Sequence, residues 1–181
     1  MHYHNITKDD MLNGDGLRVV LWVAGCNHNC PGCQNPCTHD PDDGLIFDKR
    51  AKCEIYAQLR QDYIHGITFS GGDPLHPANK KDVENLMHDI KLHFPNKTIW
   101  LYTGDTWENI RNLSLMKYVD VLVDGEFIEN LKDKKLLWKG SSNQRVIDVQ
   151  KSLNSSYLIP VLKYENYGPV TNLSRNENSI Y

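Results

Sequence analysis

The chain has 181 residues, of which 40% are hydrophobic, and this is enough for one domain with a buried core. Its net charge of -3 at pH 7 argues against a nucleic-acid or anionic-membrane partner. The first residues show no basic segment followed by an apolar one, and the longest apolar run, residues 19–25, is too short to cross a bilayer. We therefore expect a cytoplasmic protein with no signal peptide and no membrane span.

The hydrophobic pattern predicts strands and helices that alternate along the chain. Buried strands are predicted at residues 18–23, 66–70, 98–102 and 119–123. Helices are predicted at about 49–63, 83–94 and 106–115. Asp48 is the expected N-cap of the first helix and Asp105 or Thr106 that of the third, while Pro95 ends the second. This alternation indicates an α/β architecture with parallel strands.

An unusual sequence follows each predicted strand. The four are a cysteine-rich loop, Gly71-Gly72-Asp73, Tyr102-Thr103-Gly104 and Asp124-Gly125. Right-handed connections place the carboxyl ends of parallel strands on one side, where the ligand sites of α/β proteins lie. We therefore expect these four segments to converge on one site.

Cys26, Cys30 and Cys33 form a C-x3-C-x2-C pattern directly after the first predicted strand. Three thiolates this close together can bind one metal centre and leave one coordination position open, as in catalytic metal sites. Five cysteines, an odd number, fit a metal site in a reducing compartment better than a set of disulfides. Two alternatives remain open, because Cys37 or His28 could complete a closed zinc or ferredoxin-like site.

Two further segments are candidates for ligand binding. Gly71 and Gly72 would let the backbone approach a charged ligand without an intervening Cβ, although an ordinary turn has the same composition. Asn143 and Arg145, in the polar stretch 138–145, have side chains suited to a carboxylate or a ribose, although such a stretch is often a solvated loop.

In combination, these motifs resemble one family, the activating proteins of anaerobic (class III) ribonucleoside-triphosphate reductase within the radical S-adenosylmethionine (SAM) superfamily. The matching segments lie within residues 13–18, 25–35, 71–74, 102–104, 123–125 and 140–145. They cover roughly residues 1–150 in order. Asp15 stands where a proline is commoner, and Cys37 and the residues beyond about 150 are additional to the pattern.

The resemblance implies a shortened, incomplete (βα) TIM-like barrel over residues 1–150, followed by a C-terminal extension over 151–181. It implies a [4Fe-4S] cluster on Cys26, Cys30 and Cys33. The SAM-binding residues that it implies are Gly71, Gly72, Asp73, Thr103, Asp124, Asn143 and Arg145.

The implied reaction is reductive cleavage of SAM to a 5′-deoxyadenosyl radical, which removes a hydrogen from a glycine near the C-terminus of the reductase. The implied partners are that large reductase subunit and an electron donor such as flavodoxin, without nucleic acid or membrane. The alternatives are an activase of another glycyl radical enzyme of the formate lyase type, a small radical SAM enzyme such as a deazaguanine synthase, and a non-catalytic metal-binding redox module.

Overall fold

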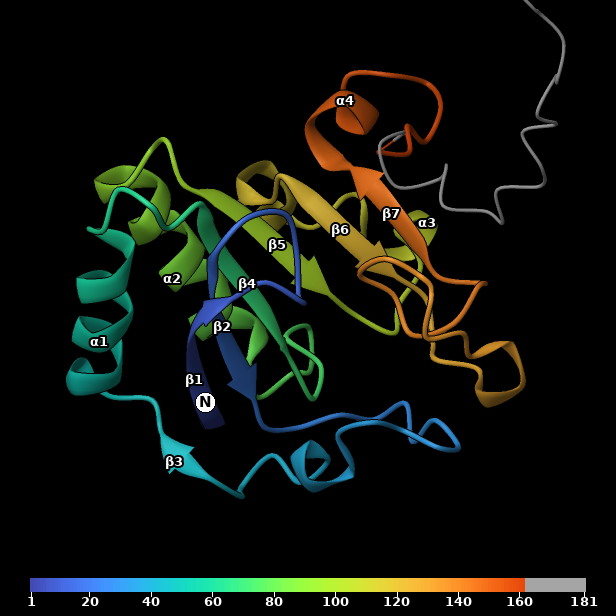
Figure 1. Ribbon diagram of the computed structural model, residues 1–181, viewed down its shortest axis with the longest axis horizontal. Helices are drawn as coiled ribbons and strands as arrows, with labels where there is room; N and C mark the ends of the chain where they lie inside the picture. The colour runs from blue at the N-terminus through green and yellow to red at the C-terminus, as the bar shows by residue number, and fades with distance from the viewer. Residues whose placement is uncertain (162–181) are drawn as a thin grey trace, which may run out of the picture.

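The computed structural model describes residues 1–161, which form one mixed sheet with helices packed against it (Figure 1). The strands are β1 (His2–Asp10), β2 (Arg18–Val23), β3 (Leu45–Ile46), β4 (Gly66–Gly71), β5 (Thr98–Tyr102), β6 (Val121–Asp124) and β7 (Arg145–Asp148). The helices are α1 (Lys49–Leu59), α2 (Lys80–His93), α3 (Trp107–Ile110) and α4 (Val149–Leu153), with 3-10 turns η1 (Pro36–Thr38), η2 (Ser114–Tyr118) and η3 (Glu129–Leu131). The strand order is β3-β1-β2-β4-β5-β6-β7, and among the described residues the sheet stays open.

The parallel centre of the sheet confirms the α/β prediction. β2, β4, β5 and β6 pair in parallel, so their carboxyl ends point the same way (Figure 1). The prediction missed β1, β3 and β7, which pair antiparallel at the two margins. β1 buries only two of its nine residues, Tyr3 and Ile6, and β3 and β7 are short, so these strands lack the apolar runs that identify the central ones.

The helices partly follow the prediction. Asp48 caps α1 as expected, because its Oδ1 accepts hydrogen bonds from the amides of Arg50 and Ala51 at 2.8 and 3.0 Å. The predicted extension of this helix to residue 63 is wrong, since α1 ends at Leu59 and the side chain of Tyr63 is exposed.

The predicted helix at 106–115 is also wrong in extent. It divides into α3 and η2, because Leu113 between them adopts an extended conformation with ψ of 139°. Thr106, one of the two predicted candidates, is the N-cap residue of α3, but its side chain makes no capping hydrogen bond. The Trp107 amide donates to Asp124 Oδ2 at 2.7 Å, so a residue at the end of β6 satisfies the start of α3 in place of Asp105 or Thr106.

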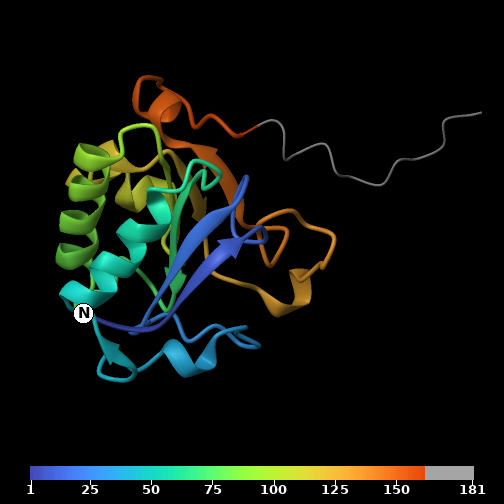
Figure 2. The ribbon, with the colours of Figure 1, turned by 60° about the vertical axis from the view of Figure 1, so that its left-hand side comes forward.

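The two faces of the sheet differ in chemistry because successive strand residues point to opposite sides. The apolar face packs against α1 and α2 and carries Val19, Leu21, Val23, Ile67, Phe69, Ile99 and Leu101 (Figure 2). The opposite face carries Arg18, Trp22, Thr68, Ser70, Trp100 and Tyr102. The second face is therefore polar and aromatic, which suits a ligand cavity better than a second layer of helices.

Residues after the predicted boundary at 150 are still attached to the sheet. That boundary lies inside α4, and the Val161 amide donates to the Val146 carbonyl at 3.0 Å. Residues 162–181, most of the expected C-terminal extension, lie outside the described residues. Among the helices of residues 1–161, none is long and apolar enough to span a membrane.

The cap of α1 provides a stability test. Asp48→Ala should lower the urea concentration at the midpoint of unfolding, because two helix amides lose their acceptor. Asp48→Asn, which keeps a side-chain oxygen, should lower this midpoint clearly less. The measurement is equilibrium urea unfolding followed by circular dichroism, and equal decreases in the two variants would contradict the capping role.

Candidate functional site

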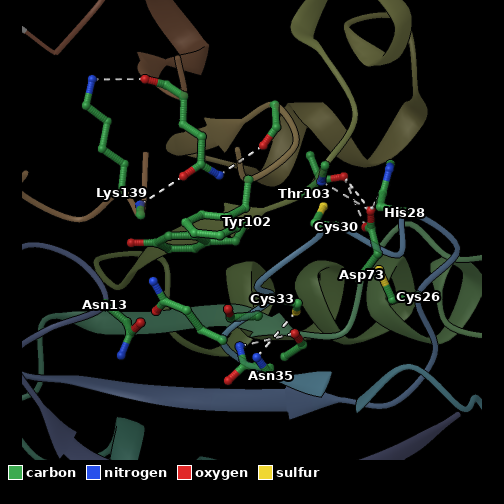
Figure 3. A pocket seen from close by; sticks show the side chains of 18 of the residues that line it. Asn13, Cys26, His28, Cys30, Cys33, Asn35, Asp73, Tyr102, Thr103 and Lys139 are labelled. Atoms are coloured by element: carbon green, nitrogen blue, oxygen red, sulfur yellow. Dashed lines mark hydrogen bonds and ion pairs between the residues drawn. The ribbon is translucent and has the colours of Figure 1, made fainter. Parts of the chain in front are cut away.

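The cysteine loop leaves the end of β2 and brings three thiols to one cavity. Cys26, Cys30 and Cys33 are all half-buried and line this cavity of about 550 Å³, which we call the cysteine cavity (Figure 3). Cys37 is exposed on η1 and is absent from the cavity lining, and Cys53 is exposed on α1. Three of the five cysteines thus line one cavity, and the other two lie outside it.

The two glycines at the end of β4 hold the cysteine loop in place. Gly71 has a φ of +109°, and a Cβ on it would lie 2.6 Å from the Val23 backbone. A Cβ on Gly72 would lie 2.5 Å from the Gly25 carbonyl oxygen and 2.7 Å from that of Thr38. Both glycines line the cysteine cavity. Close contact with the protein's own backbone also excludes a side chain at either position, so their glycine identity does not depend on a ligand.

Asp73 is the polar centre of the site and is only 3% exposed. Its carboxylate accepts hydrogen bonds from the Thr103 hydroxyl at 2.9 and 3.0 Å, and from the amides of Leu75 and Gly104 at 2.8 and 3.3 Å. The amide of Asp73 donates to the Gly25 carbonyl at 2.7 Å. The ends of β2, β4 and β5 are therefore joined through one side chain, and two predicted site residues, Asp73 and Thr103, contact each other.

His28 connects the cysteine loop to two carboxylates. Its Nε2 lies 2.7 Å from Asp73 Oδ2 and its Nδ1 lies 3.0 Å from Glu126 Oε1. Because a carboxylate can only accept, both ring nitrogens donate and the ring is positively charged. The hydrogen bond to Asp73 is the main cause that raises the pKa of His28 to about 9. From the sequence, His28 is either a possible zinc ligand or a hydrogen-bond donor near the site, but nothing in the sequence places Asp73 beside this ring.

The other predicted site residues line a second, adjoining cavity. Asp124, Asn143 and Arg145 are in its wall, and it shares His28, Gly104 and Gly125 with the cysteine cavity. Arg145 Nε donates to Asp124 Oδ1 at 3.0 Å, and its terminal nitrogens donate to the carboxylate of Glu108 at 2.9 and 3.0 Å. The bond to Arg145 is the main cause that lowers the pKa of Glu108 to about 2. The four strand-end segments converge as predicted, but they form two cavities.

The donor set fits a metal centre of the iron–sulfur type. Three thiols share a cavity of the size that holds small ligands, and sulfur ligands select iron–sulfur clusters or zinc over hard cations. Burial raises the pKa of Cys26 and Cys30, so metal binding must release protons from these thiols. In residues 1–161, Cys37 is not placed in the cavity to close a four-thiol site.

Comparison with known proteins places the chain in a family of iron–sulfur proteins. Residues 12–147 match the family of the 4Fe-4S single cluster domain, which supports an iron–sulfur cluster in this chain. The chain is 46% identical over 146 residues to a protein of Enterobacteria phage T4, covering 81% of this chain and 93% of that one. It is 43% identical to one from Salmonella typhi and 42% identical to one from Escherichia coli K12, each over 150 residues, 81% of this chain and 97% of the relative.

All three relatives are named anaerobic ribonucleoside-triphosphate reductase-activating protein. At this identity and coverage, the chain belongs to the family of these activating proteins.

The separation of Cys37 from the other three thiols can be tested through iron content. Cys26→Ala, Cys30→Ala and Cys33→Ala should each sharply lower bound iron and the visible absorbance of the cluster after anaerobic reconstitution, because each removes an expected cluster ligand. Cys37→Ala is the matched control and should keep both. Loss of iron in Cys37→Ala as complete as in the other three would mean a closed site of four thiolates.

The hydrogen-bonding role of Asp73 predicts a large stability loss on its removal. Asp73→Ala should cost roughly 3–5 kcal/mol of unfolding free energy, because the Thr103 hydroxyl, two amides and the charged His28 lose a buried acceptor. The half-buried Asp105 carboxylate lies within 4.8 Å of Asp73 and His28 but accepts no hydrogen bond among residues 1–161, so Asp105→Asn should cost less than about 1 kcal/mol. Urea unfolding measures both, and equal effects would contradict this role of Asp73.

Proposed function

We propose that this activating enzyme is a radical SAM protein that generates a glycyl radical on an anaerobic ribonucleoside-triphosphate reductase. The carrying observation is that three thiols, with the fourth apart, share one cavity with the backbone and polar groups at the ends of β4 and β5. The names of the relatives support the reductase as the partner. The open sheet with parallel central strands is compatible with the incomplete (βα) barrel that we propose for residues 1–150.

In this proposal, Cys26, Cys30 and Cys33 would hold a [4Fe-4S] cluster, and the cavity that they line would also take SAM. When bound, the cluster and SAM would supply the radical chemistry that removes a hydrogen atom from a glycine of the partner. The residues of the chain contribute binding, orientation and exclusion of water. We assign Gly71 and Gly72 to the amino-acid part of SAM, because their backbone lies at the cavity wall.

In this proposal, Asp73 and Thr103 do not bind the cofactors directly but position the loop that carries the cysteines. Their mutual bond and the bond of Asp73 to His28 keep the cysteine loop against the end of β4, so the cluster ligands are held before any ligand enters. Asp124, Asn143 and Arg145 line the adjoining cavity, and we assign that cavity to the nucleoside part of SAM. Arg145 is already bound by Asp124 and Glu108, so it would contribute an ordered wall.

The cysteine cavity also extends along the polar face of the sheet. Its wall includes Trp22, Ser70 and Tyr102 of three adjacent strands, with Asn13 from the turn before β2 (Figure 3). This extension offers room for a segment of another protein beside the thiols. We further propose an electron donor such as flavodoxin, because the cluster must be reduced before SAM is cleaved. We also propose a cytoplasmic setting for the protein.

The proposed reaction is tested by electron paramagnetic resonance. The reduced protein with SAM should produce the doublet signal of a glycyl radical on a class III reductase. The control is a reductase whose C-terminal glycine is replaced by alanine, which should give no doublet and only slow, uncoupled SAM cleavage. A doublet on a formate lyase but not on the reductase would assign the chain to the other activases, and no SAM cleavage at all would favour a redox module.

A further inference from the structure

The segment between η3 and β7 is strongly basic although the whole chain is acidic. Residues 132–139, which we call the basic segment, contain Lys132, Lys134, Lys135 and Lys139 with Asp133 as the one acidic residue. The chain as a whole has a net charge of -3 at pH 7. Four lysines against one aspartate give this short segment a positive net charge, opposite in sign to the net charge of the whole chain.

The basic segment forms part of the cysteine cavity. Lys132, Lys134 and Lys139 line it together with the three thiols. Lys132, Lys134 and Lys135 are exposed. Within the described residues, Lys8, Lys52, Lys91 and Lys151 form ion pairs, whereas the lysines of the basic segment form none. Lys139 Nζ is bonded to the Gln144 carbonyl, and Lys132 Nζ lies 6.0 Å from the centre of the Phe127 ring. Lys134 and Lys135 have no side-chain partner among residues 1–161, so their exposed ammonium groups are available to a ligand that reaches the cavity from outside.

The backbone of the basic segment is anchored at its second half. The Tyr102 hydroxyl donates to the Trp138 carbonyl at 2.8 Å, and the rings of Trp100 and Trp138 meet edge to face at 5.4 Å. Lys139 Nζ donates to the Gln144 carbonyl at 2.9 Å (Figure 3). Trp138 has a φ of 56°, a conformation that bulky residues rarely adopt and that tends to persist at ligand-binding segments. The exposed lysines are thus held at the cavity by a fixed aromatic support.

We propose that the basic segment binds an acidic stretch of the protein substrate and guides it into the cysteine cavity. This inference rests on the proposed function. A peptide fits better than a nucleic acid, because the net negative charge of the chain would repel a long polyanion. The substrate fits better than an electron donor, because lysines that line the cavity wall contact what enters the cavity, while a donor only needs to approach the cluster.

The test replaces three exposed lysines and measures the concentration dependence of activation. The variant Lys132→Gln/Lys134→Gln/Lys135→Gln keeps side-chain length and removes three charges. At low ionic strength, the reductase concentration for half-maximal glycyl radical formation should rise on the order of tenfold, because rim charges mainly set association. The difference should largely vanish at about 0.5 M salt, where exposed charges are screened.

The matched control is Lys49→Gln/Lys81→Gln/Lys117→Gln, which removes three exposed charges from outside both cavities and should leave the half-maximal concentration unchanged. Zero-length carbodiimide crosslinking should join Lys134 or Lys135 to aspartate or glutamate of the reductase. If wild-type protein forms no glycyl radical, the proposed function fails. If wild type does but the lysine variant matches it at every salt concentration, or if crosslinks form only with the electron donor, this inference alone is overturned.

Discussion

The buried carboxylate of Asp73 is the interaction on which the site depends. Parallel pairing brings the ends of β2, β4 and β5 near one another, but it does not fix the loops that follow them. The Asp73 carboxylate fixes these loops because it accepts hydrogen bonds from the Thr103 hydroxyl and the Gly104 amide after β5 and from the Leu75 amide after β4. It also accepts a hydrogen bond from His28 inside the cysteine loop. A carboxylate at this depth requires several donors, because an unpaired buried charge costs several kcal/mol. The same requirement therefore orders three loops at once.

The chemistry of the site also reflects the unequal faces of the sheet. One face is sealed by α1 and α2 over an apolar core. On the other face, the fully buried Arg18 donates to the hydroxyls of Thr68 and Thr98, each at 2.9 Å, and to the carbonyl of Ile67 at 2.8 Å. A buried guanidinium satisfied in this way ties the amino-terminal ends of β2, β4 and β5 together. On the polar face, the Arg18 network thus holds the amino-terminal ends of the strands together, and the side chains near the carboxyl ends line the cysteine cavity.

The segment after β6 lines both cavities and is hydrogen-bonded to the cysteine loop and to the residues before β7. Glu126 binds His28, Asn143 Nδ2 donates to the Glu126 carbonyl at 2.8 Å, and Gln144 Nε2 donates to the Gly125 carbonyl at 2.9 Å. The polar stretch that seemed an ordinary solvated loop is thus the support of both the cysteine loop and the basic segment. Its role is visible only when β7 returns antiparallel to β6 and brings these amides back to the end of the sheet.

The sequence by itself determined the parallel centre of the sheet, the close spacing of three cysteines after β2 and the convergence of four strand ends. These follow from local patterns: apolar runs, cysteine spacing, and the rule that parallel strands end on one side. The marginal strands, the cap of α3 by Asp124, the bridge from Asp73 to His28 and the pairing of Arg145 with Glu108 were decided by tertiary structure. The three side-chain contacts join residues 17 to 45 positions apart through single groups, and the marginal strands are held by antiparallel ladders. Such contacts leave no periodic trace in the sequence, because they depend on where the packed core places the chain.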